Sequence, residues 1–404
     1  MSSGIIRSAA IGVGALGLAA VAGWVAIGPD WRGLLRYPPV GEDVLFWSVE
    51  QRDAVFRMFD ALPFLHPFGT IERGETVREL PEGAPLDLGL DLDAFMDGQR
   101  AAGLVILHEG KVRVERYGLG FGPGKRWTSF SVAKSLTSTL VGAAIADGAI
   151  ASLDDPVSAY VAGLEGSPYD DVTVHQLLTM TSGVGWNEDY YDTQSDVAQF
   201  NNVIPVEGER SIVTYMKTLE RAHEPGTFWN YSTGETNLIG VLVSEATGEP
   251  VADYMSRKIW APFGMEKDAT WIYGADGAEM SGCCIQATTR DFARFGLFIM
   301  EGARIDGEAV VPADYLAEAT SRQATTTRLG REGYGYQWWI AEDDAFMASG
   351  IFGQTIYIDP ARELIIAMNA NWTTALGDKD GEAARRMAFF DAVQAAIDAE
   401  ATGG

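Results

Sequence analysis

The amino-acid sequence predicts an α/β fold in which a sheet domain is interrupted by an α-helical insertion. Three observations indicate this: strand-like segments lie towards both ends of the chain, helix-like segments fill its middle, and 47% of the 404 residues are hydrophobic. A chain of this length and composition can bury a large core, so we expect one large domain or two interlocked ones. Strands from both ends with helices between them are typical of a sheet covered by helices.

Residues 1–30 predict a membrane anchor. The run from Ser8 to Gly28 is apolar and uncharged, and its length matches the ~20 residues that a membrane-spanning helix needs. Trp24 and Trp31 lie near one boundary, where interfacial tryptophans are common. A cleavable signal segment is the alternative, because the small residues Ala20 and Ala22 suit a signal peptidase. Arginines on both flanks leave the orientation open, and we expect the rest of the chain to be exported.

Residues 31–100 are expected to form a lead-in region that wraps the core. Between Asp43 and Leu62 the apolar residues fall at roughly helical spacing, whereas Pro63–Pro85 is rich in turn formers and is predicted to be extended. The main domain is expected over residues 101–404, with a helical subdomain at about 153–270.

The main domain is predicted to begin with a β-hairpin and a helix. Leu104–Leu107 and Val112–Tyr117 are short apolar or alternating runs, and the four residues between them suit a tight turn. Ser131–Ile150 has a helical composition with a buried stripe.

Further helices and strands are predicted downstream. In the middle region the helix-like segments are Val174–Met180, Val213–Leu219 and Asn237–Glu245. After Gly282 the helices expected are Asp291–Met300 and Glu382–Ile397, and the strands expected are Phe346–Ala348, Thr355–Ile358 and Leu364–Met368.

Charge and cysteine content exclude several classes of function. The 56 acidic and 30 basic residues give a net charge of −26, which repels phosphate backbones and argues against nucleic acid as a partner. Cys283 and Cys284 are adjacent, so they cannot join distant segments and lack the spacing of a metal site. We therefore expect no metal, and the serine chemistry described below requires no cofactor.

Ser131 and Lys134 form the one nucleophile pattern in the sequence. The chain has no G-x-S-x-G, H-E-x-x-H or Walker motif. Ser131-Val132-Ala133-Lys134 opens a predicted helix, and residues three apart share a helix face, so the amine can reach the hydroxyl. Burial and the positive end of the helix dipole would lower the pKa of the lysine and allow it to act as a base.

Two further motifs reinforce this pattern and point to a family. Thr173–Gly183 (TVHQLLTMTSG) and Pro225–Ser232 (PGTFWNYS) follow at suitable distances. Together with S-x-x-K they resemble the serine β-lactamase and penicillin-recognising superfamily, in its class C-like branch, which includes family VIII carboxylesterases and 6-aminohexanoate-dimer hydrolase. The resemblance runs from about Gly103 to Trp372. It implies a β-lactamase-like fold, a mostly antiparallel sheet flanked by helices with a helical subdomain.

The resemblance assigns a role to each motif residue. Ser131 is the expected nucleophile, Lys134 its partner, and Tyr231 matches the tyrosine of the family's Y-x-N element. A phenol with an ordinary pKa near ~10 becomes a usable proton acceptor when a cation lies beside it. Lysine and tyrosine are thus expected to act together.

The third family element departs from the usual Lys-Thr-Gly. Ala348-Ser349-Gly350 stands in its place, where Gly350 keeps a close backbone approach. The amide of Ile351 is expected to form an oxyanion hole with the amide of Ser131. In β-lactamases the lysine helps to hold the substrate carboxylate, and Thr233 likewise replaces the asparagine of Y-x-N. An ester or non-peptide amide is therefore the expected substrate.

Two aromatic residues are candidate substrate contacts. The segments around Glu188-Asp189-Tyr190 and Gln337-Trp338-Trp339 resemble the aminohexanoate-dimer hydrolase branch, in which a tyrosine on a loop over the cleft can bond the leaving amine. Tyr190 and Trp338 are candidates on this basis, and packing in the core is the alternative for each.

These residues predict a serine hydrolase that cleaves a small ester or amide through an acyl-enzyme on Ser131. A β-lactamase or D,D-peptidase is one alternative. A catalytically silent envelope protein that binds ligands is another, although the joint presence of Ser131, Lys134 and Tyr231 disfavours it. His175 is expected to be structural, because a Ser-Lys-Tyr scheme needs no imidazole. The oligomeric state is left open.

Overall fold

The computed structural model describes residues 22–39, 43–61, 67–328, 331–341 and 343–403. Most of the predicted membrane span, residues 8–21, lies outside these described residues. Among the described residues, no helix combines the length and the apolar character that crossing a membrane requires.

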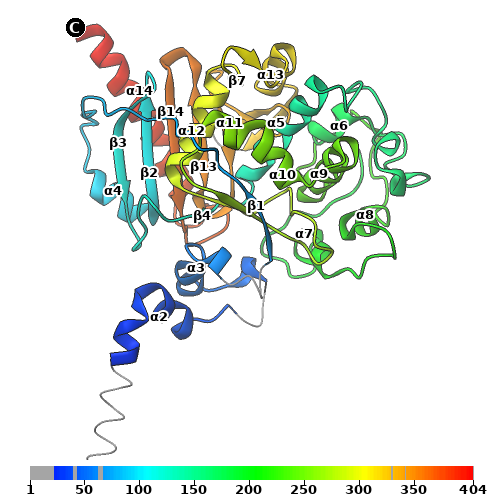
Figure 1. Cartoon of the computed structure of the whole chain (residues 1–404), viewed down its shortest axis with the longest axis horizontal. Helices are drawn as coiled ribbons and strands as arrows, with labels where there is room; N and C mark the ends of the chain where they lie inside the picture. The colour runs from blue at the N-terminus through cyan, green and yellow to red at the C-terminus, as the bar shows by residue number, and fades with distance from the viewer. Residues whose placement is uncertain (1–21, 40–42, 62–66, 329–330, 342, 404) are drawn as a thin grey trace, which may run out of the picture.

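An antiparallel sheet forms the centre of the main domain, as expected (Figure 1). Within the described residues it has eight strands in the order β3-β2-β14-β13-β12-β11-β10-β9, and every neighbouring pair is antiparallel. In that order the strands are Lys111–Tyr117, Ala101–His108, Leu364–Ala370, Thr355–Asp359, Phe346–Ser349, Trp339–Ile340, Arg331–Tyr334 and Ala324–Arg328. The first strands of the domain thus pair with its last ones, as the sequence pattern predicts.

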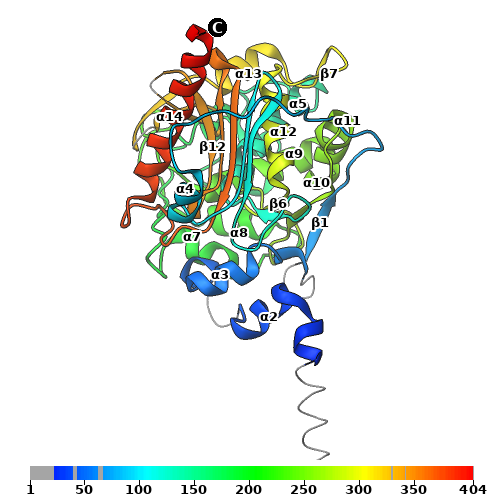
Figure 2. The same cartoon turned by 90° about the vertical axis from the view of Figure 1, so that its left-hand side faces the viewer.

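Each face of this sheet is covered by a helix, because successive side chains of a strand point to opposite faces. Leu104 and Ile106 of β2 belong to the cluster that contains Phe389 and Phe390 of α14 (Glu382–Gly403). Val105 belongs to the cluster with α12 (Thr289–Met300). Figure 2 shows α14 lying across one face of the sheet.

The predicted hairpin is confirmed, with longer strands than expected. Glu109 and Gly110 have φ angles of 52° and 70°, the left-handed conformation that a two-residue turn requires. Because the turn uses two residues, His108 and Lys111 pair with each other at the ends of β2 and β3.

A mostly helical region lies beside the sheet, on the right in Figure 1. All three predicted helices of the middle region are present, with shifted ends. The longest, α9, begins at Thr233 because the Ser232 hydroxyl caps it by accepting a hydrogen bond from the Glu235 amide at 3.1 Å. The helices here and nearby are α5 (Val132–Ala146), α6 (Val174–Leu178), α7 (Asp196–Gln199), α8 (Ser211–Met216), α9 (Thr233–Thr247), α10 (Val251–Met255), α11 (Ala261–Phe263) and α13 (Ala313–Ala319).

A second, smaller sheet was not predicted. Its strand order is β1-β5-β6-β4, from Phe68–Ile71, Ala269–Ile272, Ile285–Ala287 and Trp127–Thr128. These strands of two to four residues are too short for an alternating pattern to mark them. The sheet places β4, which leads into Ser131, beside the loop that ends at Cys284. A two-stranded ribbon, β7 (Arg304–Ile305) and β8 (Glu308–Ala309), lies elsewhere.

The lead-in region forms short helices rather than one long helix. Residues 43–61 contain α3 (Val49–Val55) between two short 3₁₀ turns. The buried guanidinium of Arg52 on α3 donates to the Trp372 carbonyl at 2.9 Å and to the Asn371 side chain at 2.8 Å. These bonds fasten the lead-in to the end of β14.

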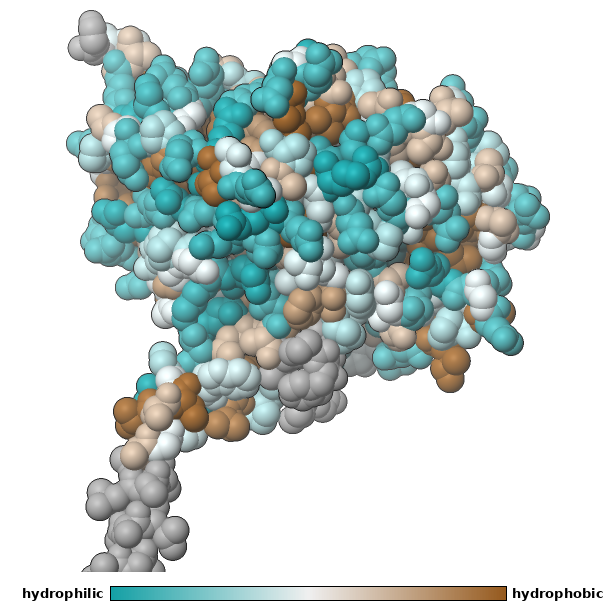
Figure 3. Space-filling model, viewed as in Figure 1, coloured by the Kyte–Doolittle hydropathy of each residue, from teal (hydrophilic) through white to brown (hydrophobic). Residues whose placement is uncertain are grey.

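Helix α2 (Gly28–Arg36) and the residues before it carry exposed apolar side chains. They lie at the base of the molecule in Figure 2, and Figure 3 shows brown, hydrophobic atoms there next to the grey ones. The exposed set is Trp24, Val25, Ile27, Trp31, Leu35 and Tyr37.

Candidate active site

Ser131 lies at the junction between strand β4 and helix α5. Phe130, just before it, has a φ of 42°, a left-handed conformation that turns the chain sharply from the strand into the helix. Lys134 follows on the same helix face, and its Nζ donates to the Ser131 Oγ at 3.1 Å. The S-x-x-K spacing therefore produces the contact that the sequence predicts.

The Lys134 amine is buried and fully engaged with acceptors. Besides Ser131, its Nζ donates to the Thr233 Oγ1 at 3.0 Å and to the Gly282 carbonyl oxygen at 2.7 Å. The side chain is 1% exposed. Burial lowers the pKa of Lys134 to about 8, because the interior disfavours the charged ammonium. At pH 7 a fraction on the order of one in ten is therefore neutral and able to accept a proton, far more than for a lysine with an ordinary pKa.

The charge of Glu188 acts on this lysine, and the Thr233 hydroxyl bonds to both residues. The Thr233 hydroxyl donates to the Glu188 carboxylate, and the Thr233 amide donates to it at 2.9 Å. Tyr190 donates its hydroxyl to the same carboxylate at 2.8 Å. The charge of Glu188 raises the pKa of Lys134 and partly opposes the effect of burial. Sequence reasoning missed this role, because no local motif links Glu188 to a lysine 54 positions earlier.

Tyr231 lies in the same cleft as Ser131 and beside Lys134. The centre of its ring is 5.3 Å from the Lys134 Nζ, and the ring stacks on Trp339 with centroids 5.2 Å apart. Tyr231 and Ser131 both line one narrow cleft. The structure thus brings together the three residues predicted to be catalytic.

Gly350 allows strand β12 to approach the nucleophile closely. A Cβ atom at this position would lie 3.0 Å from the Ser131 amide nitrogen and 2.7 Å from the Ser129 carbonyl oxygen. Ile351, the next residue, lines the cleft with Ser131. Among the described residues, the amides of Ser131 and Ile351 make no turn, loop or side-chain hydrogen bond. They remain the predicted pair of donors for an oxyanion.

A large apolar pocket opens on one side of Ser131. Its volume is about 340 Å³. Its walls are mostly hydrophobic and come from the lead-in region, the helical region and the loop after β5. Lining residues include Trp47, Val197, Phe200, Ile272 and Met280.

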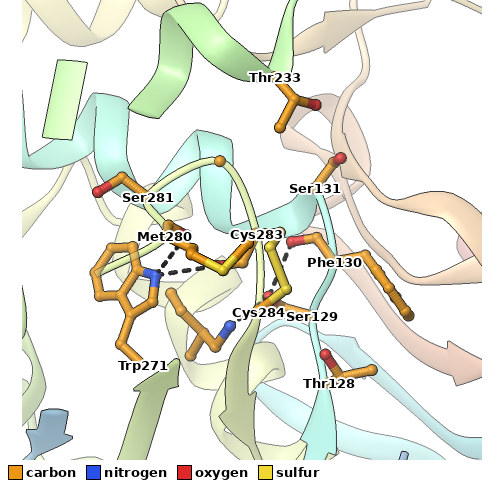
Figure 4. Close-up of a disulfide and its surroundings, with 12 residues drawn as sticks. Thr128, Ser129, Phe130, Ser131, Thr233, Trp271, Met280, Ser281, Cys283 and Cys284 are labelled. Atoms are coloured by element: carbon orange, nitrogen blue, oxygen red, sulfur yellow. Dashed lines mark hydrogen bonds between the residues drawn. A yellow bond between two sulfur atoms is a disulfide. The ribbon is translucent and has the colours of Figure 1, made fainter. Parts of the chain in front are cut away.

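Cys283 and Cys284 join to each other in a disulfide that forms part of this pocket wall. Figure 4 shows the disulfide below Ser131, with Thr233 facing the serine from the other side. The sequence prediction that these cysteines join no distant segments stands, but it did not consider a bond between neighbours. Adjacent cysteines are the signal that could have suggested it.

A narrow cationic cleft lies on the other side of Ser131. Arg331 and Arg386 line it together with Ser349, Tyr231 and Trp372. The Arg386 side chain is 1% exposed, and its Nε and Nη1 have no hydrogen-bond partner among the described residues. Burial holds its pKa well below the ordinary value, and the nearby Arg331 lowers it further. Sequence analysis showed that the lysine of the family motif is absent here. It did not identify these arginines, because they come from other elements.

Of the two candidate substrate contacts, the structure brings one to the site. Tyr190 lines both the apolar pocket and the cationic cleft. Trp338 lines neither of these, being 1% exposed and packed edge-on against Phe346. Its neighbour Trp339 lines the cleft instead, because adjacent residues in an extended chain point to opposite faces. The expectation for Trp338 is thus replaced by Trp339.

Groups of side chains suited to a metal are absent from the part of the chain that the structure describes. His175 packs edge-on against Tyr336 with ring centres 5.5 Å apart, far in the sequence from the serine motif. Ser131, Lys134 and Tyr231 can perform acyl transfer with their own groups.

Comparisons with known proteins agree with this geometry. The family model described as Beta-lactamase matches residues 91–389. The 6-aminohexanoate-dimer hydrolase of Paenarthrobacter ureafaciens is 29% identical over 297 residues, 70% of this chain and 75% of that protein.

Two solved structures share the fold. A Bacillus anthracis protein with the provisional name 6-aminohexanoate-dimer hydrolase superposes with a TM-score of 0.74 at 20% identity, covering 89% of this chain and 99% of its own. A family VIII carboxylesterase gives a TM-score of 0.58 at 17% identity, covering 78% and 99%.

Proposed function

The chain belongs to the beta-lactamase family of serine hydrolases, which includes amidases and carboxylesterases, and on that premise we propose that it cleaves small esters or amides through an acyl-enzyme on Ser131. The observation that carries the proposal is the 3.1 Å hydrogen bond from the Lys134 Nζ to the Ser131 Oγ. It joins a nucleophile to a buried amine with a lowered pKa.

The reaction takes two steps. In the first, the Ser131 Oγ attacks the substrate carbonyl carbon, and its proton passes through Lys134 and Tyr231 to the leaving oxygen or nitrogen. The bond to the leaving group breaks, and an ester forms on Ser131. In the second, water attacks this ester and gives up a proton by the same route, so that a carboxylic acid leaves and the serine hydroxyl is restored. The amides of Ser131 and Ile351 stabilise the oxyanion in both steps.

The apolar pocket supports an acyl group of hydrophobic character. Its volume of about 340 Å³ lies within the range of pockets for small organic ligands, roughly 300–1,000 Å³. The relative from Paenarthrobacter ureafaciens, by its name, hydrolyses a 6-aminohexanoate dimer. An amide with a flexible apolar chain would also fit the apolar pocket of this protein.

A second candidate is a β-lactam or another amide that carries a carboxylate. Arg386 favours it, because a buried guanidinium without a hydrogen-bond partner at two of its nitrogens can hold an anion. Together with Arg331 it provides positive charge in the cleft that contains Ser349, where the family's lysine is missing. A catalytically silent binding protein is a third possibility and has no such observation in its favour.

We also propose that the protein is membrane-anchored and that its main domain is exported. The apolar run at residues 8–28 and the exposed apolar side chains of Trp24, Val25, Trp31 and Leu35 support an anchor at this end. A disulfide is typical of an oxidising compartment. Protease treatment of spheroplasts, in which any outer membrane has been opened, tests the proposal through detection of the main domain: a domain that stays protected until the cytoplasmic membrane is lysed would contradict export.

The function is tested by hydrolysis of p-nitrophenyl butyrate by the full chain in detergent, beside its Ser131→Ala variant. Because the nucleophile is lost, kcat/KM should fall by about 10³-fold or more. Ser321→Ala, at an exposed position outside the site, is the control and should keep the activity. Nitrocefin and a non-lactam amide run in parallel separate the candidates. Equal activity of the wild type and Ser131→Ala would remove Ser131 as the nucleophile.

A further inference from the structure

The Cys283–Cys284 disulfide occupies a position that connects it to both parts of the proposed site. Both cysteines line the apolar pocket, and Cys283 is partly exposed while Cys284 is buried. The carbonyl oxygen of the preceding residue, Gly282, accepts a hydrogen bond from the Lys134 Nζ at 2.7 Å. Figure 4 shows this loop passing beside Ser131. Breaking the disulfide can therefore alter both the wall of the apolar pocket and the position of the Gly282 carbonyl that accepts from Lys134.

We propose that this disulfide is a redox-modifiable element of the active site and that its reduction to two thiols lowers the hydrolytic activity. The proposal rests on the proposed function, since it concerns the same pocket and the same lysine.

The loop on either side of the disulfide is fastened to different parts of the fold. On its N-terminal side, the Thr137 hydroxyl of α5 donates to the Ser281 carbonyl at 2.8 Å, and the Gly282 amide donates to the Asn237 side chain of α9 at 3.2 Å. On its C-terminal side, the Ile285 amide donates to the Ser129 hydroxyl at 2.9 Å. The disulfide lies between these anchors, so it fixes how the chain turns from one to the other.

The backbone of Cys284 shows what the disulfide holds in place. Its φ is 72°, in the left-handed region that residues other than glycine rarely adopt. While the two sulfurs are bonded, the closed ring restricts this residue. Once the bond is broken, Cys284 is free to return to a negative φ, and the neighbouring Gly282 carbonyl can turn away from Lys134.

Reduction also changes the shape of the pocket wall. Two bonded sulfurs form one compact surface, whereas two thiols must separate to a non-bonded distance and each needs its own space. Because the cysteines lie beside Met280 and Ile272 in the apolar pocket, the separated thiols would intrude on the space for the acyl group. We expect kcat to fall through Lys134 and KM to rise through the pocket.

The chemistry is thiol–disulfide exchange with a small dithiol. A thiolate of the dithiol attacks one protein sulfur to form a mixed disulfide, and its second thiol then closes a cyclic disulfide on the reagent. The reagent is oxidised, and Cys283 and Cys284 together receive two electrons and two protons. The apolar pocket, with Cys283 partly exposed, provides access.

The test uses dithiothreitol on the full chain, because the chain has only two cysteines and alkylation counts them unambiguously. Ester hydrolysis is measured before and after reduction, and the mass after iodoacetamide treatment reports the number of thiols. We expect a fall in kcat/KM of about tenfold or more with full reduction, and recovery after reoxidation. Unchanged activity of a protein that takes up two alkyl groups would overturn the proposal, as would free thiols in fully active enzyme isolated without reductant from an oxidising compartment.

Two variants separate the effect of the Cys284 backbone conformation from the effect of losing the disulfide bond. Cys284→Ser removes the disulfide and keeps a side chain that disfavours a positive φ, so it should resemble the reduced enzyme. Cys284→Gly removes the disulfide but tolerates the left-handed φ, so it should retain more activity than the serine variant. Neither should respond to dithiothreitol. A response in either variant, or wild-type activity in both, would contradict the proposal.

A structural readout keeps this inference distinct from the proposed function. The buried Trp271 donates its Nε1 to the carbonyl oxygens of Met280 and Cys283, each at 3.0 Å, so its fluorescence should change on reduction, and Trp271→Phe identifies its share of the signal. If the oxidised protein hydrolyses neither an ester nor an amide, the proposed function fails, while a fluorescence change still reports movement of the loop. If the oxidised protein is active and neither activity nor fluorescence responds, the redox inference alone fails.

Discussion

The two sides of Ser131 differ in size, polarity and charge. On one side lies the apolar pocket of about 340 Å³, with aromatic, aliphatic and disulfide walls. On the other lies the narrow cationic cleft, where Arg331 and Arg386 are close to Ser349. The nucleophile belongs to both, and so does Tyr190.

The difference indicates how a substrate is oriented. Burial of hydrocarbon in the apolar pocket is favourable without any specific partner. A buried cation such as Arg386, in contrast, is costly unless an anion or hydrogen-bond acceptor meets it. We therefore expect the apolar part of the substrate on the disulfide side and polar or anionic groups on the arginine side, with the scissile bond at Ser131 between them.

The largest effect should come from the residue that serves both sides. Lys134→Met removes the base whatever the substrate, so kcat should fall by about 10²- to 10⁴-fold for neutral and anionic esters alike. Lys258→Met, which removes a lysine paired with Asp147 at 2.7 Å and distant from the motif, is the control. Steady-state kinetics on both ester classes checks this. A loss confined to one class would assign Lys134 to substrate binding instead.

Arg386→Met should affect anionic substrates selectively. A charge-assisted hydrogen bond contributes about 1.5–3 kcal/mol, so kcat/KM for a p-nitrophenyl ester with a terminal carboxylate should fall about tenfold to a hundredfold relative to p-nitrophenyl butyrate. Since this substitution removes a buried cation whose Nε and Nη1 have no hydrogen-bond partner among the described residues, the melting temperature should rise.

Arg385→Met is the matched control for this substitution. The Arg385 guanidinium is exposed and donates to the carbonyl oxygens of Asp380 at 2.6 Å and Gly98 at 3.2 Å. It should leave the ratio of the two ester rates unchanged. An equal loss for both esters in Arg386→Met would mean that the cleft does not discriminate by charge.

The apolar pocket predicts a dependence on acyl chain length. Each additional buried CH₂ group is worth about 0.8 kcal/mol, so kcat/KM should rise about fourfold per carbon from the acetyl to longer acyl esters until the pocket is filled. Val197→Phe, which adds bulk to the pocket wall, should shift the optimum to shorter chains. Val206→Phe, at an exposed position, should not. A flat series in the wild type would place the acyl group elsewhere.

The smallest expected effect is a displacement of the pH profile. The amine of Lys134 accepts a proton only in its neutral form, and its pKa is lowered to about 8, so kcat/KM for a neutral ester should rise with pH and level off above about pH 8. Glu188→Gln removes a charge that raises this pKa, so the rise should move to lower pH. Asp189→Asn is the control, since the Asp189 carboxylate accepts a hydrogen bond from the Tyr191 amide instead. A profile unchanged in Glu188→Gln would contradict the effect of the Glu188 charge on Lys134.

The sequence by itself determined the features that depend on local periodicity. Helical spacing placed Lys134 within reach of Ser131. Short apolar runs marked β2, β13 and β14, which are buried on both faces, and an alternating run marked β3, which is buried on one face. The order of the motifs around Ser131, Thr173–Gly183 and Tyr231 indicated the family. Each of these signals is carried by residues close together in the chain or by a motif of fixed order.

Tertiary structure alone decided which distant residues complete the site. Glu188 reaches Lys134 through Thr233, the Gly282 carbonyl is held against the same amine, and Arg386 enters from the C-terminal helix. The tertiary structure also determined that Trp339, and not Trp338, lines the cationic cleft. These contacts join residues tens to hundreds of positions apart, and their geometry depends on how the packed elements meet. No periodic pattern in the chain records that geometry, whereas spacing along one helix or strand is fixed by the backbone itself.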